Sequence, residues 1–278
     1  MGSITGHTKM RSILTAIGLT LTGLGVCVSN AALVIDSLNT ANVINFDSFT
    51  GAGFQPSPGA GQLSSDSWAV TGWSDGNLAF GGTATTGDYA RGTDSDGVTT
   101  GGMYAFIVEA GNAALGFQPG GSDWAPGTLT LRLQNNTGTT ITSLVIGYEV
   151  YVRNDQGRAN SFNFSHSANN VDYTPILDLN FVSPEVADVT PTWVSTSRST
   201  TLSGLSIGDG VLYYLRWNGA DVSGSGSRDE FALDDLSITA VPEPAEWGLI
   251  CAMGLLGVCG LHTWRERRRA QRQLPSAS

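Results

Sequence analysis

Apolar and polar residues alternate along several short stretches of this chain, and a period of two is the signature of a half-buried β-strand. In the stretch 128–133 the alternation places Leu129, Leu131 and Leu133 on one face. The stretch 144–152 repeats the pattern with Leu, Ile, Tyr and Val at every second position. Both stretches therefore predict strands with one face turned toward a core.

The same alternation recurs further along the chain. Phe162 and Phe164 share one predicted face, and Trp217 belongs to another that begins near residue 211. Strand signals also occur at 43–47, 68–73, 103–109, 192–202 and 230–240. The sequence Asn-Asn-Thr-Gly at 135–138 lies between two of the alternating stretches and predicts a hairpin turn.

Residues 32–240 are expected to form one all-β domain. No stretch of this body has the 3.6-residue period of an amphipathic helix, and no fixed repeat is evident. The segment 82–102 is mostly Gly, Thr, Asp and Ser and predicts long loops around one weak strand. Roughly a dozen short strands with glycine-rich turns favour a β-sandwich, jelly-roll-like in its connections.

The first 31 residues have the pattern of a secretory signal peptide. Lys9 and Arg11 precede an apolar run at 13–28, and Ser-Asn-Ala follows at 29–31. We expect a signal helix that signal peptidase removes after Ala31, with cleavage after Ala32 as the alternative. A buried N-terminal helix is the other interpretation of this segment.

The last residues, 241–278, combine three features in a fixed order. Pro242, Glu243 and Pro244 come first, and an apolar stretch without formal charge follows at 247–264. Eighteen helical residues rise about 27 Å, close to the ~30 Å hydrocarbon thickness of a bilayer. We therefore expect a transmembrane helix that ties the precursor to the cytoplasmic membrane.

A basic cluster ends this tail. Its arginines are Arg265, Arg267, Arg268 and Arg269. Because positive residues favour the cytoplasmic side of a membrane, the body is expected on the outer side.

This three-part tail resembles the PEP-CTERM sorting signal of Gram-negative bacteria. The resemblance implies recognition by an exosortase, processing near Pro242-Glu243-Pro244, and delivery of the body to the cell surface or the extracellular polysaccharide matrix. Proline excludes regular helix and central strand, so the motif is expected to be extended and accessible. An ordinary C-terminal anchor is the alternative, but it gives no reason for the Pro-Glu-Pro sequence.

A second resemblance covers about residues 100–240. The motifs at 135–138, 141–144, 215–217 and 231–239 are similar to jelly-roll modules of secreted bacterial proteins, including carbohydrate-binding ones. In several of those families an aspartate of the last strand helps to hold a structural calcium ion, which would be Asp234 here. This resemblance supports the fold more than any activity.

Charge and cysteine content exclude several classes of function. From residue 32 to 240 the chain has 17 Asp and 4 Glu against 7 Arg, a net charge of −14, and it contains neither Lys nor Cys. An acidic body excludes general nucleic-acid binding. Without cysteine, the body has no internal disulfide, no thiol catalysis and no Cys-ligated zinc.

The body offers little for catalysis, and no catalytic residue is assigned. Its one histidine, His166, alternates with Phe162 and Phe164, so a structural role is expected. Acidic residues are plentiful enough for a glycosidase pair, but the sequence brings no two of them together. The candidates are Glu109, Glu149, Glu185, Asp229, Glu230, Asp234 and Asp235.

Calcium is the one cofactor considered for the acidic loops. Asp94 and Asp96 begin a sequence, Asp-Ser-Asp-Gly, that starts like a calcium loop. Asp234 is expected on the same face as Leu236 and therefore to be partly buried. A buried carboxylate needs a cation or several donors, so calcium, an arginine such as Arg216, or backbone N–H groups remain open as partners.

Sugar binding would use exposed aromatic rings with planar polar neighbours. Four tryptophans lie near expected loops or strand ends: Trp68, Trp73, Trp124 and Trp193. The first three are the candidate ligand residues, whereas Trp217 fits the core. The leading hypothesis is a non-catalytic structural or adhesive protein of the cell surface, exopolysaccharide matrix or biofilm. The alternatives are a carbohydrate-binding module, with or without calcium, and a secreted glycan hydrolase.

Overall fold

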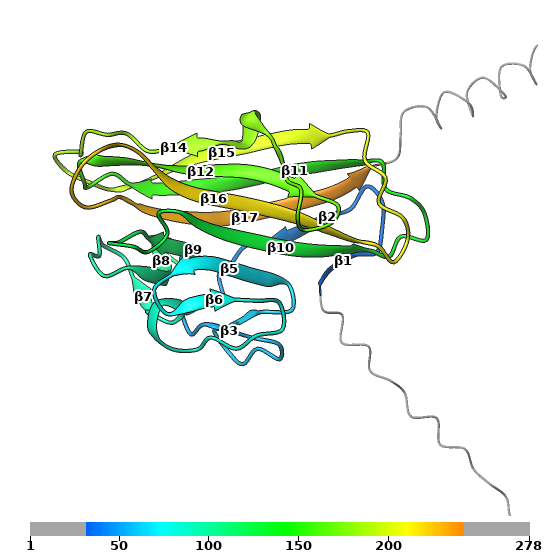
Figure 1. The fold of residues 1–278 in the computed structure, drawn as a ribbon, viewed down its shortest axis with the longest axis horizontal. Coiled ribbons are helices and arrows are strands. Elements are labelled where there is room, and N and C mark those ends of the chain that lie inside the picture. Colours follow the sequence, from blue (N-terminus) through cyan, green and yellow to red (C-terminus); the bar gives the residue numbers. More distant parts are fainter. Residues whose placement is uncertain (1–31, 242–278) are drawn as a thin grey trace, which may run out of the picture.

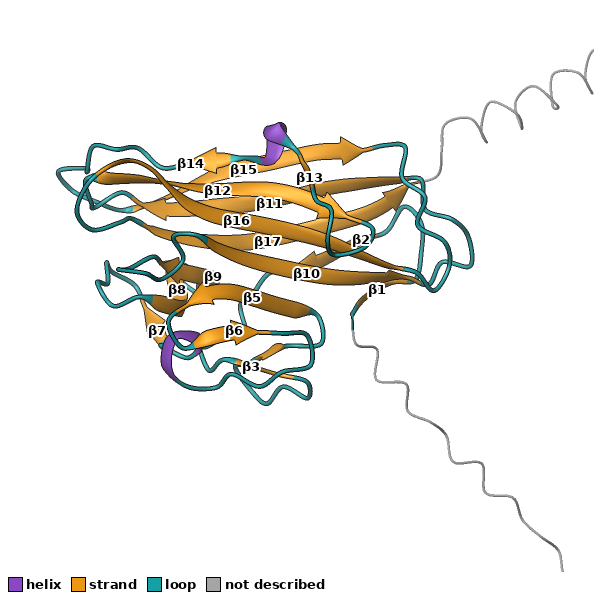
Figure 2. Ribbon diagram, in the orientation of Figure 1, coloured by secondary structure: helices purple, strands orange, loops and turns teal. Residues whose placement is uncertain are grey.

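The computed structural model describes residues 32–241, and these residues form two β-sheets that face each other, with a third, two-stranded sheet beside them (Figures 1 and 2). The eight-stranded sheet has the order β13 (Thr174–Pro175), β12 (Arg158–Ser167), β16 (Leu212–Gly224), β10 (Gly127–Asn135), β5 (Trp68–Trp73) and β6 (Gly76–Leu78), with β1 (Leu33–Ile35) beside β10 and β14 (Phe181–Val182) beside β12.

The seven-stranded sheet has the order β15 (Trp193–Leu202), β11 (Ser143–Arg153), β17 (Glu230–Val241), β9 (Asn112–Gln118), β8 (Gly102–Glu109) and β7 (Thr93–Asp94), with β2 (Ala41–Ile44) beside β17. The small sheet pairs β3 (Phe54–Gln55) with β4 (Leu63–Ser64), and two short 3-10 turns are η1 (Gly87–Tyr89) and η2 (Leu177–Leu179). The strands expected at 68–73, 103–109, 192–202 and 230–240 are confirmed.

The connections confirm the jelly-roll-like sandwich. From β10 to β17 the long strands alternate between the two sheets: β10, β12 and β16 belong to one, and β11, β15 and β17 to the other. A chain that crosses from sheet to sheet in this way surrounds a core between two layers. No helix of residues 32–241 is long and apolar enough to cross a membrane.

The predicted hairpin at 135–138 is wrong, because β10 and β11 lie in different sheets. Asn135 is buried, and its amide nitrogen donates to the carbonyl oxygens of Thr139, at 2.6 Å, and Ile207, at 2.7 Å. Its side-chain oxygen accepts the Thr137 N–H at 3.0 Å. These bonds hold a crossing between the layers, and a turn-forming sequence alone does not distinguish a crossing from a hairpin.

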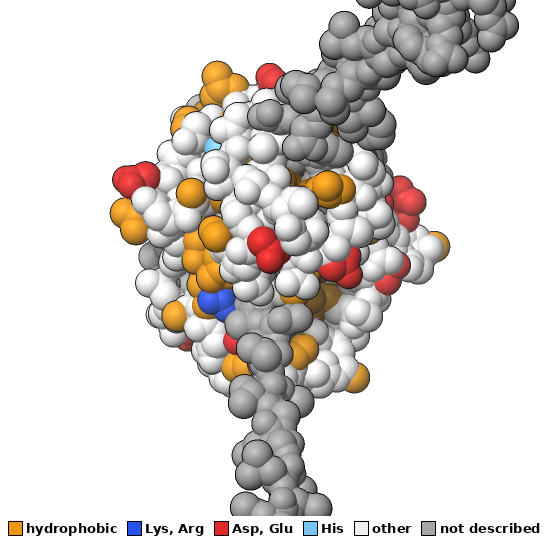
Figure 3. Space-filling view, turned by 90° about the vertical axis from the view of Figure 1, so that its right-hand side faces the viewer, with side chains coloured by type: hydrophobic (Ala, Val, Ile, Leu, Met, Phe, Trp, Pro, Cys, Tyr) orange, Lys and Arg blue, Asp and Glu red, His pale blue; other side chains and the backbone are white. Residues whose placement is uncertain are grey.

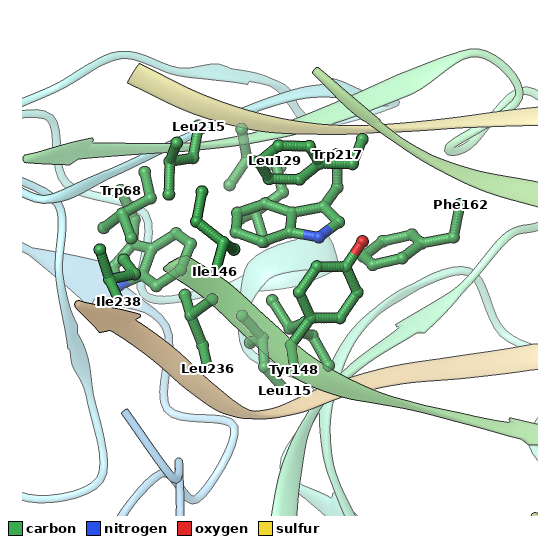
Figure 4. Packing of buried hydrophobic residues seen from close by; sticks show 14 of the residues in the cluster. Trp68, Leu115, Leu129, Ile146, Tyr148, Phe162, Leu215, Trp217, Leu236 and Ile238 are labelled. Atoms are coloured by element: carbon green, nitrogen blue, oxygen red, sulfur yellow. The ribbon is translucent and has the colours of Figure 1, made fainter. Parts of the chain in front are cut away.

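Trp217 lies at the centre of the core between the sheets and is fully buried, as expected (Figure 4). Its ring centroid lies 5.4 Å from that of Phe164 and 5.6 Å from that of Tyr148. Trp68 and Phe162 pack against it from the same sheet, at 6.2 Å and 6.4 Å. Large aromatic groups therefore join the two layers.

A second apolar cluster covers the outer face of the seven-stranded sheet. It contains Tyr104, Phe106, Val108, Ala114, Tyr151 and Ala232, with Val98 and Trp193 packed against it. The loop before β8 contributes to this cover, since the Val98 N–H donates to Glu230 and the Trp193 indole donates to the Ser95 carbonyl. This part of the face is thereby shielded from solvent.

A β-bulge places Asp234 on the opposite face from the one predicted. The register pairs Asp234 with Glu149 and Ser237 with Gly147, so β17 has one more residue than β11 between these pairs. Asp235 takes a positive φ of 47° within this bulge. The extra residue shifts the alternation. As a result, Leu236 faces the core while Asp234 lies on the outer face beside the second apolar cluster.

Candidate functional site

The outward positions of β10 and β16 form a polar strip along the eight-stranded sheet. On β10, Thr128, Thr130 and Arg132 alternate with the buried leucines. On β16, Arg216 and its neighbours at 214 and 218 alternate with the buried Leu215 and Trp217 in the same way. The register places Arg216 directly opposite Thr130. The strip is thus built by the alternation that also builds the core.

A hollow of about 290 Å³ opens on this face. Its volume is at the lower end of the ~300–1,000 Å³ range of small-molecule sites. The residues that line it come from β5, β10, β16, the β6 hairpin and the loop after β12: Ala69, Thr71, Asn77, Leu78, Ala79, Phe80, Thr128, Thr130, Asn170 and Arg216. We call this set the sheet-face hollow.

Arg216 is held by three contacts. Its Nε donates to Thr130 Oγ1 at 2.9 Å, and its Nη2 donates to Asn170 Oδ1 at 3.3 Å. The central carbon of the guanidinium lies 3.6 Å from the centre of the Tyr173 ring, a cation–π contact. The Tyr173 hydroxyl also donates to Asn170 Oδ1, at 2.5 Å. The guanidinium plane is therefore fixed before any ligand arrives.

Phe80 also lines the hollow and is partly exposed. The Arg132 guanidinium lies 4.5 Å from the centre of its ring, and Arg132 also donates to the Asp66 carbonyl. The Tyr214 ring lies 6.1 Å from that of Phe80. Phe80, Tyr173 and Tyr214 thus present three partly exposed rings on one face.

Neutral polar groups lie on the same face of the sheet as the rings. The hydroxyls of Thr71 and Thr128 lie 2.7 Å apart on neighbouring strands. Asn218 donates to the Asn163 carbonyl at 3.1 Å and to Ser165 Oγ at 3.2 Å, so its amide is oriented by β12. Hydroxyl and amide groups of this kind both donate and accept hydrogen bonds.

Burial shifts the pKa values of both Arg216 and Tyr173. It lowers the pKa of Arg216, and it raises the pKa of Tyr173 although the neighbouring Arg216 charge opposes that rise. The arginine nevertheless stays charged and the phenol neutral at physiological pH. On the side of the molecule that Figure 3 shows, basic side chains are sparse.

The structure corrects the prediction for the three candidate tryptophans. Trp68, Trp73 and Trp124 are only 3%, 5% and 1% exposed, so their ring faces pack in the core. Trp124 lies 4.6 Å from Phe117 between ring centroids, against the backbone of Gly219, where a side chain would collide with the indole. Position near a loop in the sequence did not reveal this inward packing.

The candidate calcium residues do not form one site. Among residues 32–241 no group of three or more His, Cys, Asp or Glu side chains is arranged to hold a metal. Asp94 Oδ1 accepts the Asp96 N–H at 2.8 Å, a local turn contact. Asp234 accepts the Asp235 N–H, also at 2.8 Å, while its Oδ2 is buried without a partner. Calcium binding stays a prediction.

An arginine such as Arg216 was a second partner considered for Asp234, beside calcium and backbone N–H groups. The two residues lie on different sheets, and no ion pair joins them in the described part of the chain. Burial raises the pKa of Asp234 to about 6, and the Asp235 charge adds to the rise.

Catalytic candidates gain no support. Each of four hollows on residues 32–241 is lined by at most one acidic side chain. His166 is half-buried, and its Nδ1 lies 2.5 Å from the Tyr213 hydroxyl, within hydrogen-bond distance. This contact fits the structural role expected for His166. Burial lowers the pKa of His166, so it is neutral at physiological pH.

The sorting motif Pro242, Glu243 and Pro244, the stretch 247–264 and the arginines of the tail lie outside the described residues, as does the signal sequence. The structure therefore leaves these predictions as they stand.

Sequence reasoning missed the sheet-face hollow. One signal was present: Tyr214, Arg216 and Asn218 occupy the polar positions of a strand whose other positions are strongly apolar. The loop residues Phe80 and Tyr173 gave no such signal, because only the tertiary fold brings them beside β16.

No family model and no curated protein matches the sequence. Among solved structures, the chain is similar to the K1 cleaved adhesin domain of Lys-gingipain from Porphyromonas gingivalis W83, with 14% identity and a TM-score of 0.39 over 73% of this chain and 99% of that one. A xylan-binding module, CBM15, gives 10% identity and a TM-score of 0.36 over 74% and 99%.

The CBM22-1 xylan-binding domain from Paenibacillus barcinonensis gives 13% identity and a TM-score of 0.34 over 76% and 99% of the two chains. At these values the likeness carries no conclusion about function, which depends on the site itself.

Proposed function

We propose that this protein is an exported, non-catalytic glycan-binding module that acts at the cell surface or in the extracellular matrix of a Gram-negative bacterium. The observation that supports this most is the sheet-face hollow. It combines a partly exposed aromatic ring, Phe80, with threonine hydroxyls and with a fixed guanidinium, which the neighbouring Tyr173 ring supports.

Each part of the hollow matches one part of a sugar. The C–H groups of a pyranose ring pack on aromatic faces, and its hydroxyls pair with planar or hydroxylic polar groups. The strands that carry Thr128, Thr130 and Arg216 are anchored by core residues on their other face, so the site is rigid. Rigid polar groups bind a ligand without a large ordering cost.

The structural or adhesive role expected from the sequence becomes specific in this proposal, because the protein would adhere by holding a polysaccharide. Export by a signal peptide and sorting by an exosortase are parts of the same proposal. They are supported by residues 1–31 and by the Pro-Glu-Pro sequence at 242–244. β17 runs to Val241, so the last strand of the sandwich is complete immediately before that motif.

A glycan array tests the binding function. The full-length chain is expected to bind at least one polysaccharide, and Phe80→Ala is expected to weaken that binding. Val189→Ala, at a fully exposed position, serves as the matched control and should bind as the unaltered chain does. Absence of binding to every glycan, or equal binding by the Phe80 variant, would contradict the proposal.

The sorting part has its own test. Mass spectrometry of the mature protein from its native host should find the new N-terminus at residue 32 or 33 and a C-terminus near residues 242–244. A full-length chain with both ends intact would contradict the proposed route.

A further inference from the structure

Arg216 has hydrogen-bonding capacity that the protein does not use. A guanidinium carries five N–H donors, and the described residues accept from two of them, at Thr130 Oγ1 and Asn170 Oδ1. Both acceptors are neutral. The remaining donors belong to a side chain that lines the sheet-face hollow.

The lack of an acidic partner distinguishes Arg216 from most arginines of the body. Ion pairs join Arg91 to Asp88, Arg153 to Asp155, and both Arg158 and Arg228 to Asp221. Within residues 32–241, Arg216 takes part in no ion pair. This is notable in a body with 17 Asp and 4 Glu against 7 Arg.

The side chains around Arg216 hold it in place but bring it no acidic partner. Tyr173 supports the guanidinium plane at 3.6 Å, and its hydroxyl donates to the same Asn170 oxygen that accepts from Arg216. The hollow itself has no acidic lining residue. A fixed, partly desolvated guanidinium with free donors is suited to a carboxylate, which it can bind through two parallel hydrogen bonds.

We propose that the sheet-face hollow takes a carboxylate-bearing sugar, a uronic acid within a polysaccharide, with its carboxylate on Arg216 and its ring against Phe80. This inference rests on the proposed glycan-binding function and specifies its ligand class. The negative body repels polyanions at long range, so the selection comes from this local contact rather than from overall charge.

The test compares polysaccharides that differ only in their carboxyl groups. Full-length chain is titrated with polygalacturonate, alginate and hyaluronan, and with the same polymers after carbodiimide–borohydride reduction of their carboxylates to hydroxymethyl groups. At least one native polymer should bind about tenfold more tightly than its reduced form.

Variants assign that preference to one residue. Arg216→Gln should remove the preference for the native polymer. Arg216→Lys should keep part of it, because lysine retains the charge but cannot form the two parallel hydrogen bonds of a guanidinium. Arg198→Gln is the matched control, since Arg198 lies on β15 of the other sheet, near Phe181. Thermal melting checks that each variant is folded.

The outcomes separate the two proposals. Equal binding of native and reduced polymers, or an unchanged preference in a folded Arg216→Gln variant, overturns the uronic-acid inference and leaves glycan binding in place. Failure to bind any of these polymers by a chain that binds a glycan on the array also overturns only the uronic-acid inference, whereas absence of binding to every glycan on the array overturns both. Loss of preference in the Arg216 variants but not in the Arg198 variant supports the inference.

Discussion

The guanidinium of Arg216 lies 3.6 Å from the ring of Tyr173, and the two side chains share the oxygen of Asn170 as a hydrogen-bond acceptor. A ring at this distance stabilises the charge and orients the plane of its donors. The loop after β12 thereby determines the geometry of a residue on β16.

Removing the ring should therefore weaken ligand binding although the arginine remains. Tyr173→Ala is expected to raise the dissociation constant for the bound glycan about tenfold, measured by isothermal titration calorimetry. Tyr173→Phe keeps the ring and should retain most of the affinity. Unchanged affinity in the alanine variant would show that Tyr173 does not support the site.

Trp217 should be among the most sensitive positions for folding, because its side chain joins both layers of the core. Trp217→Ala is expected to lower the free energy of unfolding by about 3–5 kcal/mol. Urea denaturation gives the value. Val189→Ala, fully exposed, should change it by less than about 0.5 kcal/mol. Similar losses in the two variants would contradict the position assigned to Trp217.

Gly116 allows a test of the packing in the second apolar cluster, which contains Phe106. A Cβ there would lie 2.2 Å from the Phe106 ring, so Gly116→Ala should destabilise the protein by about 1–3 kcal/mol. Gly147→Ala is the matched control on β11, where the nearest atoms lie 3.5 Å or further from the new carbon. An equal effect of the two substitutions in urea denaturation would contradict the packing of Phe106 on β9.

Glu230 should make the protein less stable as the pH rises. The residue is fully buried, and burial raises its pKa to about 8, with the Asp155 charge adding to the rise. One oxygen accepts the Val98 N–H at 2.6 Å, and the other is buried without a partner. Burial also raises the pKa of Asp229 and of Asp234 to about 6.

The sign follows from proton binding in the two states. The folded protein keeps the Glu230 proton up to about pH 8, whereas the unfolded chain loses it near the ordinary value of 4.5, so stability falls between these values. Urea denaturation at about pH 5 and about pH 8.5 measures the fall. Glu230→Gln should reduce it. A pH dependence that Glu230→Gln leaves unchanged would contradict the assignment.

Carboxylates with lowered pKa do not obscure this window. The hydrogen bond from Arg228 holds the pKa of Asp221 below its usual value. For Asp88, burial acts to raise the pKa, but the hydrogen bonds from Asp75, Ser74 and Arg91 outweigh burial, and the pKa is below its usual value. Their contributions are lost only on acidification below about pH 4, which lies outside the measured range.

Much of the sandwich could be predicted from alternation alone, because a strand with one buried face repeats every two residues. The prediction failed where geometry breaks that repeat. The bulge at Asp234–Asp235 reverses the inward and outward positions of β17, and a bulge has no reliable signal in a single sequence. The segment after Asn135 was likewise predicted as a hairpin, because turn-forming residues do not indicate which sheet the next strand joins.

The candidate site was harder to predict than the fold. Tryptophans near loops were natural candidates for sugar contacts, but Trp68, Trp73 and Trp124 are core residues. Phe80 and Tyr173, whose rings are partly exposed, are separated by more than ninety positions in the sequence and share one face only through the pairing of β5, β10 and β16. Contacts of this kind depend on tertiary structure.

Hydroxyl-radical footprinting of the full-length chain, with and without a glycan selected by the array, tests the central claim most directly. Exposed aromatic rings are oxidised, and a bound ligand protects them. The account predicts protection of Phe80, Tyr173 and Tyr214, with Trp193 on the seven-stranded sheet unchanged. Protection of Trp193 without protection of those three rings would place the ligand on the other sheet and contradict the account.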